Sequence, residues 1–109
     1  MSTPFQHQII TRALEIISDE KHWTTLVVSS EADGTPCPCQ DPLAVRFCAI
    51  GALFRAASEL LGDGGAEQGF KAAKFVLVAN NRPHDPLPQI NDQEGHAVIV
   101  AMFKHALAS

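Results

Sequence analysis

The segment from residue 42 to residue 61 constrains the fold more than any other part of the chain. Its large apolar residues recur at alternating steps of four and three, which is the spacing of one helix face. These residues are Leu43, Phe47, Ile50, Phe54, Ala57 and Leu61. The remaining sides carry mainly small residues, and a helix that is apolar nearly all round is a buried one. We therefore predict a central helix over residues 42–61, started by the Asp41-Pro42 pair and ended at Gly62.

Two further helices are indicated by the same kind of apolar spacing. Residues 4–19 have an apolar face, with Thr3 suited to the N-cap and Pro4 to the first helical position. Residues 66–78 repeat the pattern after the glycines that end the central helix. Both segments are therefore predicted to pack against the central helix.

A fourth helix is predicted near the C-terminal end of the sequence. Asn91 and Glu94 match a capping box, and an apolar face follows over residues 98–107. The stretches FVLVA (75–79) and AVIVAMF (97–103) are rich in β-branched residues and could form strands. We predict helix for both, because the helical spacing continues on either side of each.

The segment between the first two helices has no helical periodicity. Prolines near residue 37 exclude a helix there, and Asp33-Gly34 is typical of a turn. We expect this segment to pack over the core through Trp23, Leu26 and Val28, although irregular segments of this length are often functional. The predicted fold class is mainly α: a single domain over residues 1–109, of about four helices, with a long irregular segment between helices 1 and 2.

Charge and hydropathy exclude several classes of partner. The chain has 8 basic and 12 acidic residues, a net charge of −4, and its basic residues are scattered, so no nucleic-acid surface is predicted. No apolar run is long enough for a membrane span. The N-terminal residues lack a secretion signal and the cysteines number three, so we expect reduced thiols and a cytoplasmic protein.

The low charge content favours association with another protein. Charged residues make up 18% of the chain, which leaves apolar surface for a partner to cover. Val98, Ile99, Met102 and Phe103 give the fourth helix more apolar width than a four-element core needs. We therefore predict another protein as partner, and a homodimer through this helix or its neighbour.

Cys48 is the residue on which an enzymatic function would depend. In a helix that starts at residue 42, Cys48 lies about two turns inside, where the helix dipole no longer lowers a thiol pKa. We therefore predict a packing role beside Gly51, with the Asn91-Asp92 turn as the segment that packs there. The alternative is a small thiol-dependent enzyme in which Cys48 is the nucleophile, with His96 and either Asn91 or Asp92 as its partners.

Cys37 and Cys39 raise the question of a metal site. A structural zinc ion needs four ligands, usually in paired motifs, and here Cys48 and His84 would have to complete the set. Because a second paired motif is missing, we predict no metal and no cofactor, and keep these four residues as an alternative for a metal-binding or small-molecule-binding domain.

Several landmarks together resemble a known family. They are Trp23, the Asp33-Gly34 turn, the run RFCAIGALFRAA (46–57) and the Asn91-Asp92 pair. The sequence is similar to small bacterial and phage proteins grouped as a domain of unknown function. This resemblance implies a mostly helical fold and no particular activity. The leading prediction is a cytoplasmic protein-interaction or regulatory module rather than an enzyme.

Overall fold

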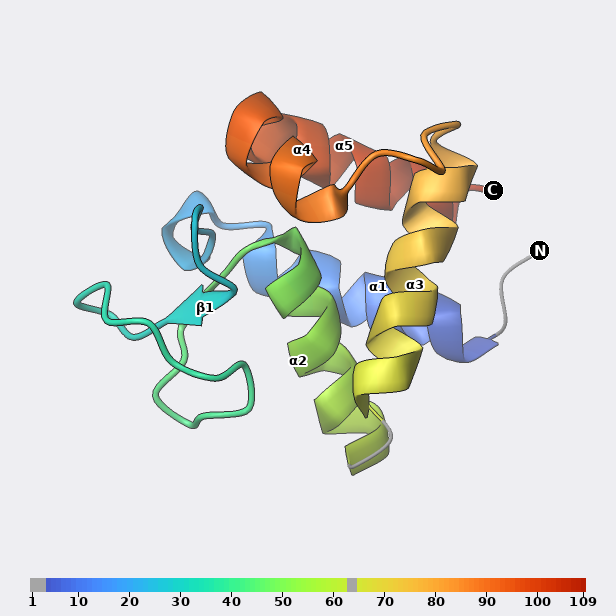
Figure 1. Ribbon diagram of the computed structural model, residues 1–109. Helices are drawn as coiled ribbons and strands as arrows, with labels where there is room; N and C mark the ends of the chain where they lie inside the picture. The colour runs from blue at the N-terminus through green and yellow to red at the C-terminus, as the bar shows by residue number, and fades with distance from the viewer. Residues whose placement is uncertain (1–3, 63–64) are drawn as a thin grey trace.

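The computed structural model describes residues 4–62 and 65–109, and within these ranges the protein is mainly helical, as predicted (Figure 1). In chain order the elements are α1 (Pro4–Ile17), the 3₁₀ helix η1 (Glu20–His22), β1 (Ser29–Ser30), β2 (Arg46–Phe47), α2 (Ala49–Leu61), α3 (Gly65–Ala79), α4 (Leu87–Glu94) and α5 (His96–Leu107). The two short strands pair antiparallel, with Ser29 opposite Phe47 and Ser30 opposite Arg46.

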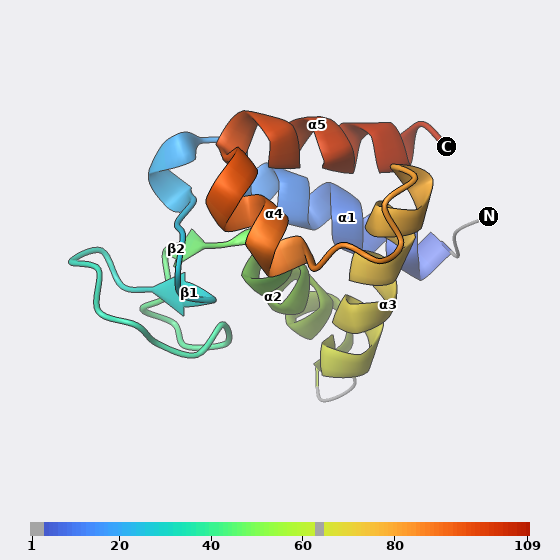
Figure 2. The same cartoon turned by 45° about the horizontal axis from the view of Figure 1, so that its top comes forward.

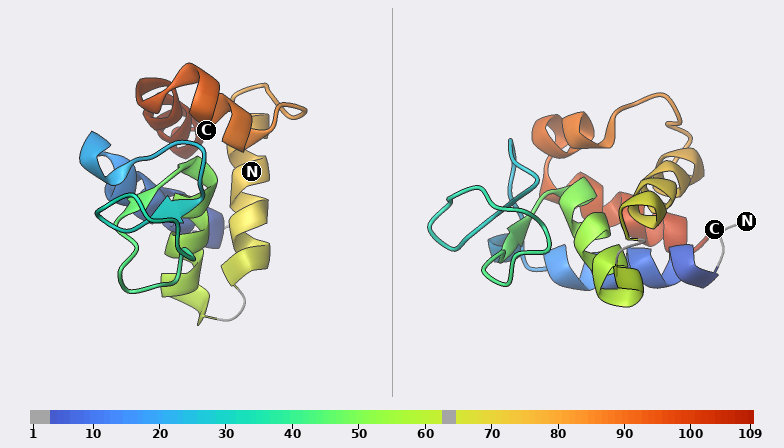
Figure 3. Two further views of the ribbon diagram at one scale, coloured as in Figure 1. Left: turned by 60° about the vertical axis from the view of Figure 1, so that its left-hand side comes forward. Right: turned by 60° about the horizontal axis from the view of Figure 1, so that its bottom comes forward.

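The helices form two antiparallel pairs that share one core. α2 and α3 lie side by side, and α5 runs along α1 in the opposite direction (Figures 1 and 2). α4 crosses the N-terminal end of α2, and the irregular segment lies beside α2, where Arg55 contacts it (Figure 3). The largest fully buried apolar side chains in the described ranges are Phe103, Ile9, Ile10, Ile17, Leu53, Ile99 and Val76.

Small residues allow α2 and α3 to approach each other closely. Ala56, Ala57, Ala72 and Ala73 are all buried between or beside these helices. A Cβ atom added at Gly65 would lie only 2.8 Å from the backbone nitrogen of Ser58. The pair can therefore bury its apolar faces with little space between the two backbones.

The central helix begins seven residues later than predicted. Asp41 accepts a hydrogen bond from the backbone nitrogen of Leu43, 2.8 Å away, so the Asp41-Pro42 pair opens a turn and not a helix. The backbone nitrogen of Val45 then donates to the oxygen of Ser30, and the chain enters β2. The sheet therefore takes backbone groups that a helix over 42–48 would have used. The predicted end is confirmed, because Gly62 caps α2 with a φ of 63°.

The C-terminal helical region divides into two helices where one was predicted. Gly95 has a φ of 95°, and α4 ends there while α5 begins at the next residue. Asn91 and Glu94 lie inside α4, so the predicted capping box is wrong. The prediction of helix for residues 75–79 and 97–103 is confirmed.

The boundaries of the other two helices lie close to those predicted. α1 ends at Ile17 rather than at residue 19, and α3 extends from Gly65 to Ala79. The predicted cap at Thr3 lies outside the described residues. Within the described part of the chain, no helix combines the length and the apolar character that crossing a membrane requires.

The irregular segment packs on the core less than expected. Trp23 is half-buried against the core, as predicted. Leu26, by contrast, is 85% exposed and Val28 is 43% exposed, so the prediction that they cover the core is wrong. On α5 the apolar side chains are more buried than predicted. Ile99 and Phe103 are completely buried, and Met102 is nearly so. The apolar width that suggested a dimer is thus used within the chain.

Candidate functional site

Asn91 joins three segments of the chain at the N-terminal end of α2. Its side-chain oxygen accepts hydrogen bonds from the indole nitrogen of Trp23 (2.7 Å) and the backbone nitrogen of Ala49 (2.9 Å). Its amide nitrogen donates to the backbone oxygen of Thr24 and to Oδ1 of Asp92, both at 3.0 Å. The side chain is completely buried. An amide suits this place because it supplies an acceptor and two donors without a charge to desolvate.

Asp92 holds the neighbouring segment in an unusual backbone conformation. Its Oδ1 atom also accepts a hydrogen bond from the backbone nitrogen of Leu26, 3.0 Å away. Leu26 has a φ of 71°, a left-handed conformation that costs a side chain other than glycine about 1–2 kcal/mol. The side chain that is held this way points to solvent, since it is 85% exposed. The Asn91-Asp92 pair thus fixes the position of an exposed leucine.

A small apolar cavity lies beside this leucine. We call it the Leu26 pocket, and its volume is about 160 Å³. It is lined by Leu26, Val27, Val28, Cys48, Ile50, Pro88 and Asp92. Cys48 and Ile50 are buried, whereas Leu26 and Asp92 are exposed, so the cavity has an apolar floor and one carboxylate at its rim.

Val28 packs against the face of α2 that carries small residues. The Asn91-Asp92 turn was predicted to pack there. The backbone oxygen of Val28 accepts a hydrogen bond from the backbone nitrogen of Cys48. A Cβ atom at Gly51 would lie 2.0 Å from that same oxygen. The predicted close contact at Gly51 therefore exists, but its partner is Val28. Asn91 instead contacts the end of the helix, at Ala49.

Cys48 is the N-cap of α2, and the prediction that it lies two turns inside a helix is wrong. Its sulfur accepts a hydrogen bond from the backbone nitrogen of Gly51, 3.4 Å away. A helix N-terminus is a place where thiol pKa values are often lowered. Here burial is the larger effect and raises the pKa of the Cys48 thiol, which is only 4% exposed. This environment favours an unreactive thiol that packs and caps.

His96 contacts the end of α1 and the ring of Trp23. It is the first residue of α5, and its Nε2 atom lies 2.6 Å from the backbone oxygen of Ile17, at the end of α1. Its ring and the Trp23 ring pack in a T-shaped arrangement, with centroids 5.4 Å apart. The structure thus brings Cys48, Asn91 and Asp92 to one end of α2, while the His96 nitrogen is bound to another helix. His96, the histidine named in the alternative of a cysteine nucleophile, thus has its Nε2 atom at the backbone oxygen of Ile17.

The residues of the metal alternative do not gather into one ligand set. Cys37 is half-buried and Cys39 is buried, and Ser29 donates a hydrogen bond to the backbone oxygen of Cys37. Burial raises the pKa of both thiols. His84 is exposed in the connection between α3 and α4. Across residues 4–62 and 65–109, no group of three or more His, Cys, Asp or Glu side chains could hold a metal ion.

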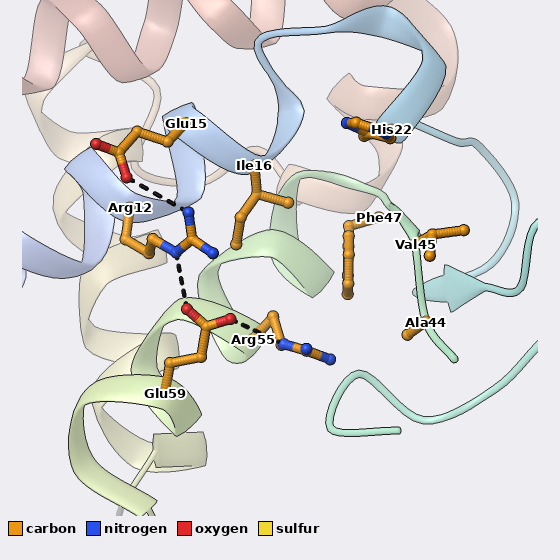
Figure 4. A pocket seen from close by; sticks show the side chains of 9 residues that line it. All are labelled: Arg12, Glu15, Ile16, His22, Ala44, Val45, Phe47, Arg55 and Glu59. Carbon is orange, nitrogen blue, oxygen red and sulfur yellow. Dashed lines mark hydrogen bonds and ion pairs between the residues drawn. The ribbon is translucent and has the colours of Figure 1, made fainter. Parts of the chain in front are cut away.

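A second, larger cavity lies between α1, α2 and β2 (Figure 4). We call it the α1–α2 groove, and its volume is about 370 Å³. It is lined by Arg12, Glu15, Ile16, His22, Ala44, Val45, Phe47, Arg55 and Glu59. In Figure 4 the charged side chains of Arg12, Glu15, Arg55 and Glu59 gather on one side, and the other side carries Ala44, Val45 and Phe47 together with His22.

Glu59 organises the charged wall of the α1–α2 groove. It accepts hydrogen bonds from Arg12 (2.7 Å) and from Arg55 (3.0 Å), and these bonds, that of Arg12 first, lower the pKa of its carboxyl group. Arg55 also donates to the backbone oxygens of Cys39 and Asp41, which ties the irregular segment to α2. This groove was not among the sites predicted from the sequence. The i, i+4 spacing of Arg55 and Glu59 could have indicated one ion pair, but not the contact with Arg12, 47 residues away.

These features define a class of small helical domain in which a buried asparagine closes the end of a central helix. The chain belongs to a family whose model is described as "Family of unknown function (DUF6197)" and matches residues 1–109. No curated protein and no solved structure matches the chain. The resemblance to a domain of unknown function is confirmed at the level of the family, which attaches no activity to it.

Proposed function

We propose that the protein is a protein-interaction module whose binding surface centres on Leu26. The observation that carries this proposal is a large apolar side chain that is 85% exposed and is held at a φ of 71° by a hydrogen bond to Asp92. Strained backbone persists only where surrounding structure enforces it, and it is concentrated at functional sites. Here the enforcing structure is the network of Asn91 and Asp92.

The surroundings of Leu26 support a role in binding. Val28 is 43% exposed beside it, and the Leu26 pocket provides a recess of about 160 Å³. A protein interface typically has a few anchoring side chains around which the other contacts exclude water. A backbone that is already held in one conformation loses little conformational entropy when it binds. The hydrogen bond from the Leu26 backbone nitrogen to Asp92 holds the backbone in this way.

The test begins by identifying what contacts this surface. A photo-crosslinking amino acid placed at position 28 in the otherwise native chain should capture the partner in cells, and the purified partner then allows affinity to be measured. Leu26→Gly should weaken that affinity by at least about tenfold, as for an interface hot spot. Val78→Ser removes an apolar side chain that is 52% exposed on α3, and it should leave the affinity unchanged. The opposite pattern would contradict the proposal.

A small-molecule-binding function is a second candidate, supported by the α1–α2 groove. Its volume of about 370 Å³ falls within the range typical of ligand sites, about 300–1,000 Å³, and it combines apolar walls with convergent charged groups. Val45→Trp should fill the groove, and Leu43→Trp places the same ring outside it on the same segment. A compound that raises the melting temperature of the native protein and of Leu43→Trp, but not of Val45→Trp, would support this function. Equal stabilisation of all three proteins would refute it.

Two further proposals concern the cellular compartment and the oligomeric state. We propose the cytoplasm as the compartment, because three cysteines cannot all pair within one chain and all three are free thiols, which persist in a reducing environment. We also propose self-association through the surface of α5 and the end of α3, where Val98 and Ala101, which the core does not fully cover, line a shallow groove of about 450 Å³ together with Ala79. Light scattering that gives the monomer mass at high micromolar concentration would reject the homodimer.

A further inference from the structure

We infer that the Leu26 pocket receives a lysine side chain of the partner protein. This inference rests on the proposed interaction function and specifies which chemistry the partner presents to the surface. Leu26 would contact the partner directly, and the lysine would enter the recess next to it. The lining of the pocket, its size and the hydrogen bonds of Asp92 each support this assignment.

The lining matches a side chain that is aliphatic along its length and positively charged at its tip. The lining residues other than Asp92 are apolar or a thiol, and none of the seven is basic. Asp92 is exposed at the rim, where a charged group can keep part of its hydration. Lysine places its methylene stem against apolar surface while its ammonium group stays near water. The chain as a whole has a net charge of −4, which also favours a basic partner segment.

The volume of the pocket excludes larger ligands. Sites for cofactors and other small molecules usually measure about 300–1,000 Å³, and this pocket measures about 160 Å³. It can therefore hold one side chain but not a nucleotide or a comparable molecule. The remaining contacts of a partner would have to lie outside it, on Leu26 and Val28.

The hydrogen bonds of Asp92 distinguish lysine from arginine. Its Oδ1 atom already accepts two hydrogen bonds, one from Leu26 and one from Asn91. Arginine binds carboxylates best through two parallel bonds to both oxygen atoms, and that arrangement needs Oδ1 as well. An ammonium group acts as a compact point charge and can use the other oxygen alone. The site thus suits lysine better.

A nuclear magnetic resonance titration of the full chain tests this inference with three probes of matched length. The probes are n-butylammonium, which reproduces the lysine side chain, n-butanol, which lacks the charge, and butyrate, which reverses it. Butylammonium should shift the amide signals of residues 26–28 and 48–50 and bind about threefold to tenfold more tightly than butanol. Butyrate should produce no shifts there.

Two variants show whether Asp92 is the cause of the preference. Asp92→Asn retains an oxygen for the Leu26 amide but removes the charge, and it should reduce butylammonium binding to the level of butanol. Glu67→Gln removes one exposed charge on α3 and should change nothing, which controls for the net charge of the protein. An unchanged coupling constant between the amide and α protons of Leu26, which reports φ, confirms in free Asp92→Asn that the backbone conformation is retained.

The outcomes separate this inference from the proposed function. Equal binding of butylammonium and butanol, or butylammonium binding that Asp92→Asn does not weaken, would overturn the lysine assignment. The proposed function would still stand if Leu26→Gly weakens partner binding. If Leu26→Gly leaves partner binding unchanged, the interaction surface itself is wrong, whatever the probes do.

Discussion

The side-chain oxygen of Asn91 lies 2.7 Å from the indole nitrogen of Trp23, a residue 68 positions earlier in the chain. The same oxygen accepts a hydrogen bond from the backbone nitrogen of Ala49, the first residue of α2. Both of these groups can only donate, so the orientation of the amide is fixed by its neighbours. One uncharged side chain thereby attaches α4 and the irregular segment to the central helix.

Loss of this amide should destabilise the protein strongly. Asn91→Ala leaves the buried donor at Ala49 without an acceptor, at a cost of about 1–3 kcal/mol, and leaves the part-buried donor at Trp23 without one at a smaller cost. We expect the free energy of unfolding, measured by urea denaturation, to fall by about 2–4 kcal/mol. Gln93→Ala alters an exposed position of the same helix and should change it by less than about 0.5 kcal/mol. A loss below about 1 kcal/mol for Asn91→Ala would show that water replaces the missing oxygen.

Gly51→Ala should also be severe, for a steric reason. The added Cβ atom would lie 2.0 Å from the backbone oxygen of Val28, so either α2 or the irregular segment must move. We expect a loss of unfolding free energy at or above the upper end of the range for overpacking, about 1–3 kcal/mol. Gly34→Ala provides the comparison, since its φ of 91° is unfavourable for alanine but no atom lies within 4 Å of the new Cβ. If the two variants lose the same stability, the close contact with Val28 is not the cause.

Leu26→Gly should leave the fold as stable as before or more stable. Glycine adopts a positive φ without the cost of about 1–2 kcal/mol paid by leucine, and this gain is partly offset by its greater freedom in the unfolded chain. We expect a rise in unfolding free energy of up to about 1 kcal/mol. Leu43→Gly, at a 61% exposed position without a positive φ, should instead cost about 0.5–1 kcal/mol. A clear loss for Leu26→Gly would mean that leucine stabilises the fold, and would weaken the case for a binding role.

Cys48 should behave as a protected thiol. With a thiol probe at neutral pH, Cys37 should react first, because it is half-buried whereas Cys48 is only 4% exposed. Burial also raises the pKa of the Cys48 thiol above its ordinary value of 9.0. The folded protein holds this proton more tightly than the unfolded chain, so the free energy of unfolding should fall as the pH rises above about 9. Cys48→Ser should reduce that dependence and keep most of the stability, since serine is a good N-cap. Labelling of Cys48 ahead of Cys37 and Cys39 would revive the alternative of a nucleophile.

The sequence allowed prediction of the elements whose causes are local. Helical spacing located α1 and α3 and correctly assigned helix to residues 75–79 and 97–103. The same spacing extended α2 back to residue 42, because the apolar pattern continues through Phe47. Only the pairing of β1 with β2, between segments 16 to 18 residues apart, removes residues 46 and 47 from the helix. Tertiary pairing thus overrode a local pattern.

The residues of the candidate site could be recognised from the sequence, but their contacts could not. Cys48, Gly51 and the Asn91-Asp92 pair were recognised as landmarks, and the structure places all four residues at the N-terminal end of α2. Their roles could not be read from spacing, because each depends on a partner that is far away in sequence. The exposure of Leu26 has the same origin. A leucine among Thr and Val residues indicates a buried strand unless the bond to Asp92, 66 residues later, is known.

The long reach of the Asn91 contacts has a consequence for the order in which the protein folds. α2 and α3 are consecutive in sequence and can pair early, whereas the bonds from Asn91 to Ala49 and Trp23 close loops of 42 and 68 residues. We therefore expect these bonds to be absent from the folding transition state. In stopped-flow experiments Asn91→Ala should then speed unfolding and leave refolding nearly unchanged, while Ala72→Gly, between α2 and α3, should slow refolding. The hydrogen bonds of Asn91 would thus form after the helices have assembled, and they would set the lifetime of the native state by slowing unfolding.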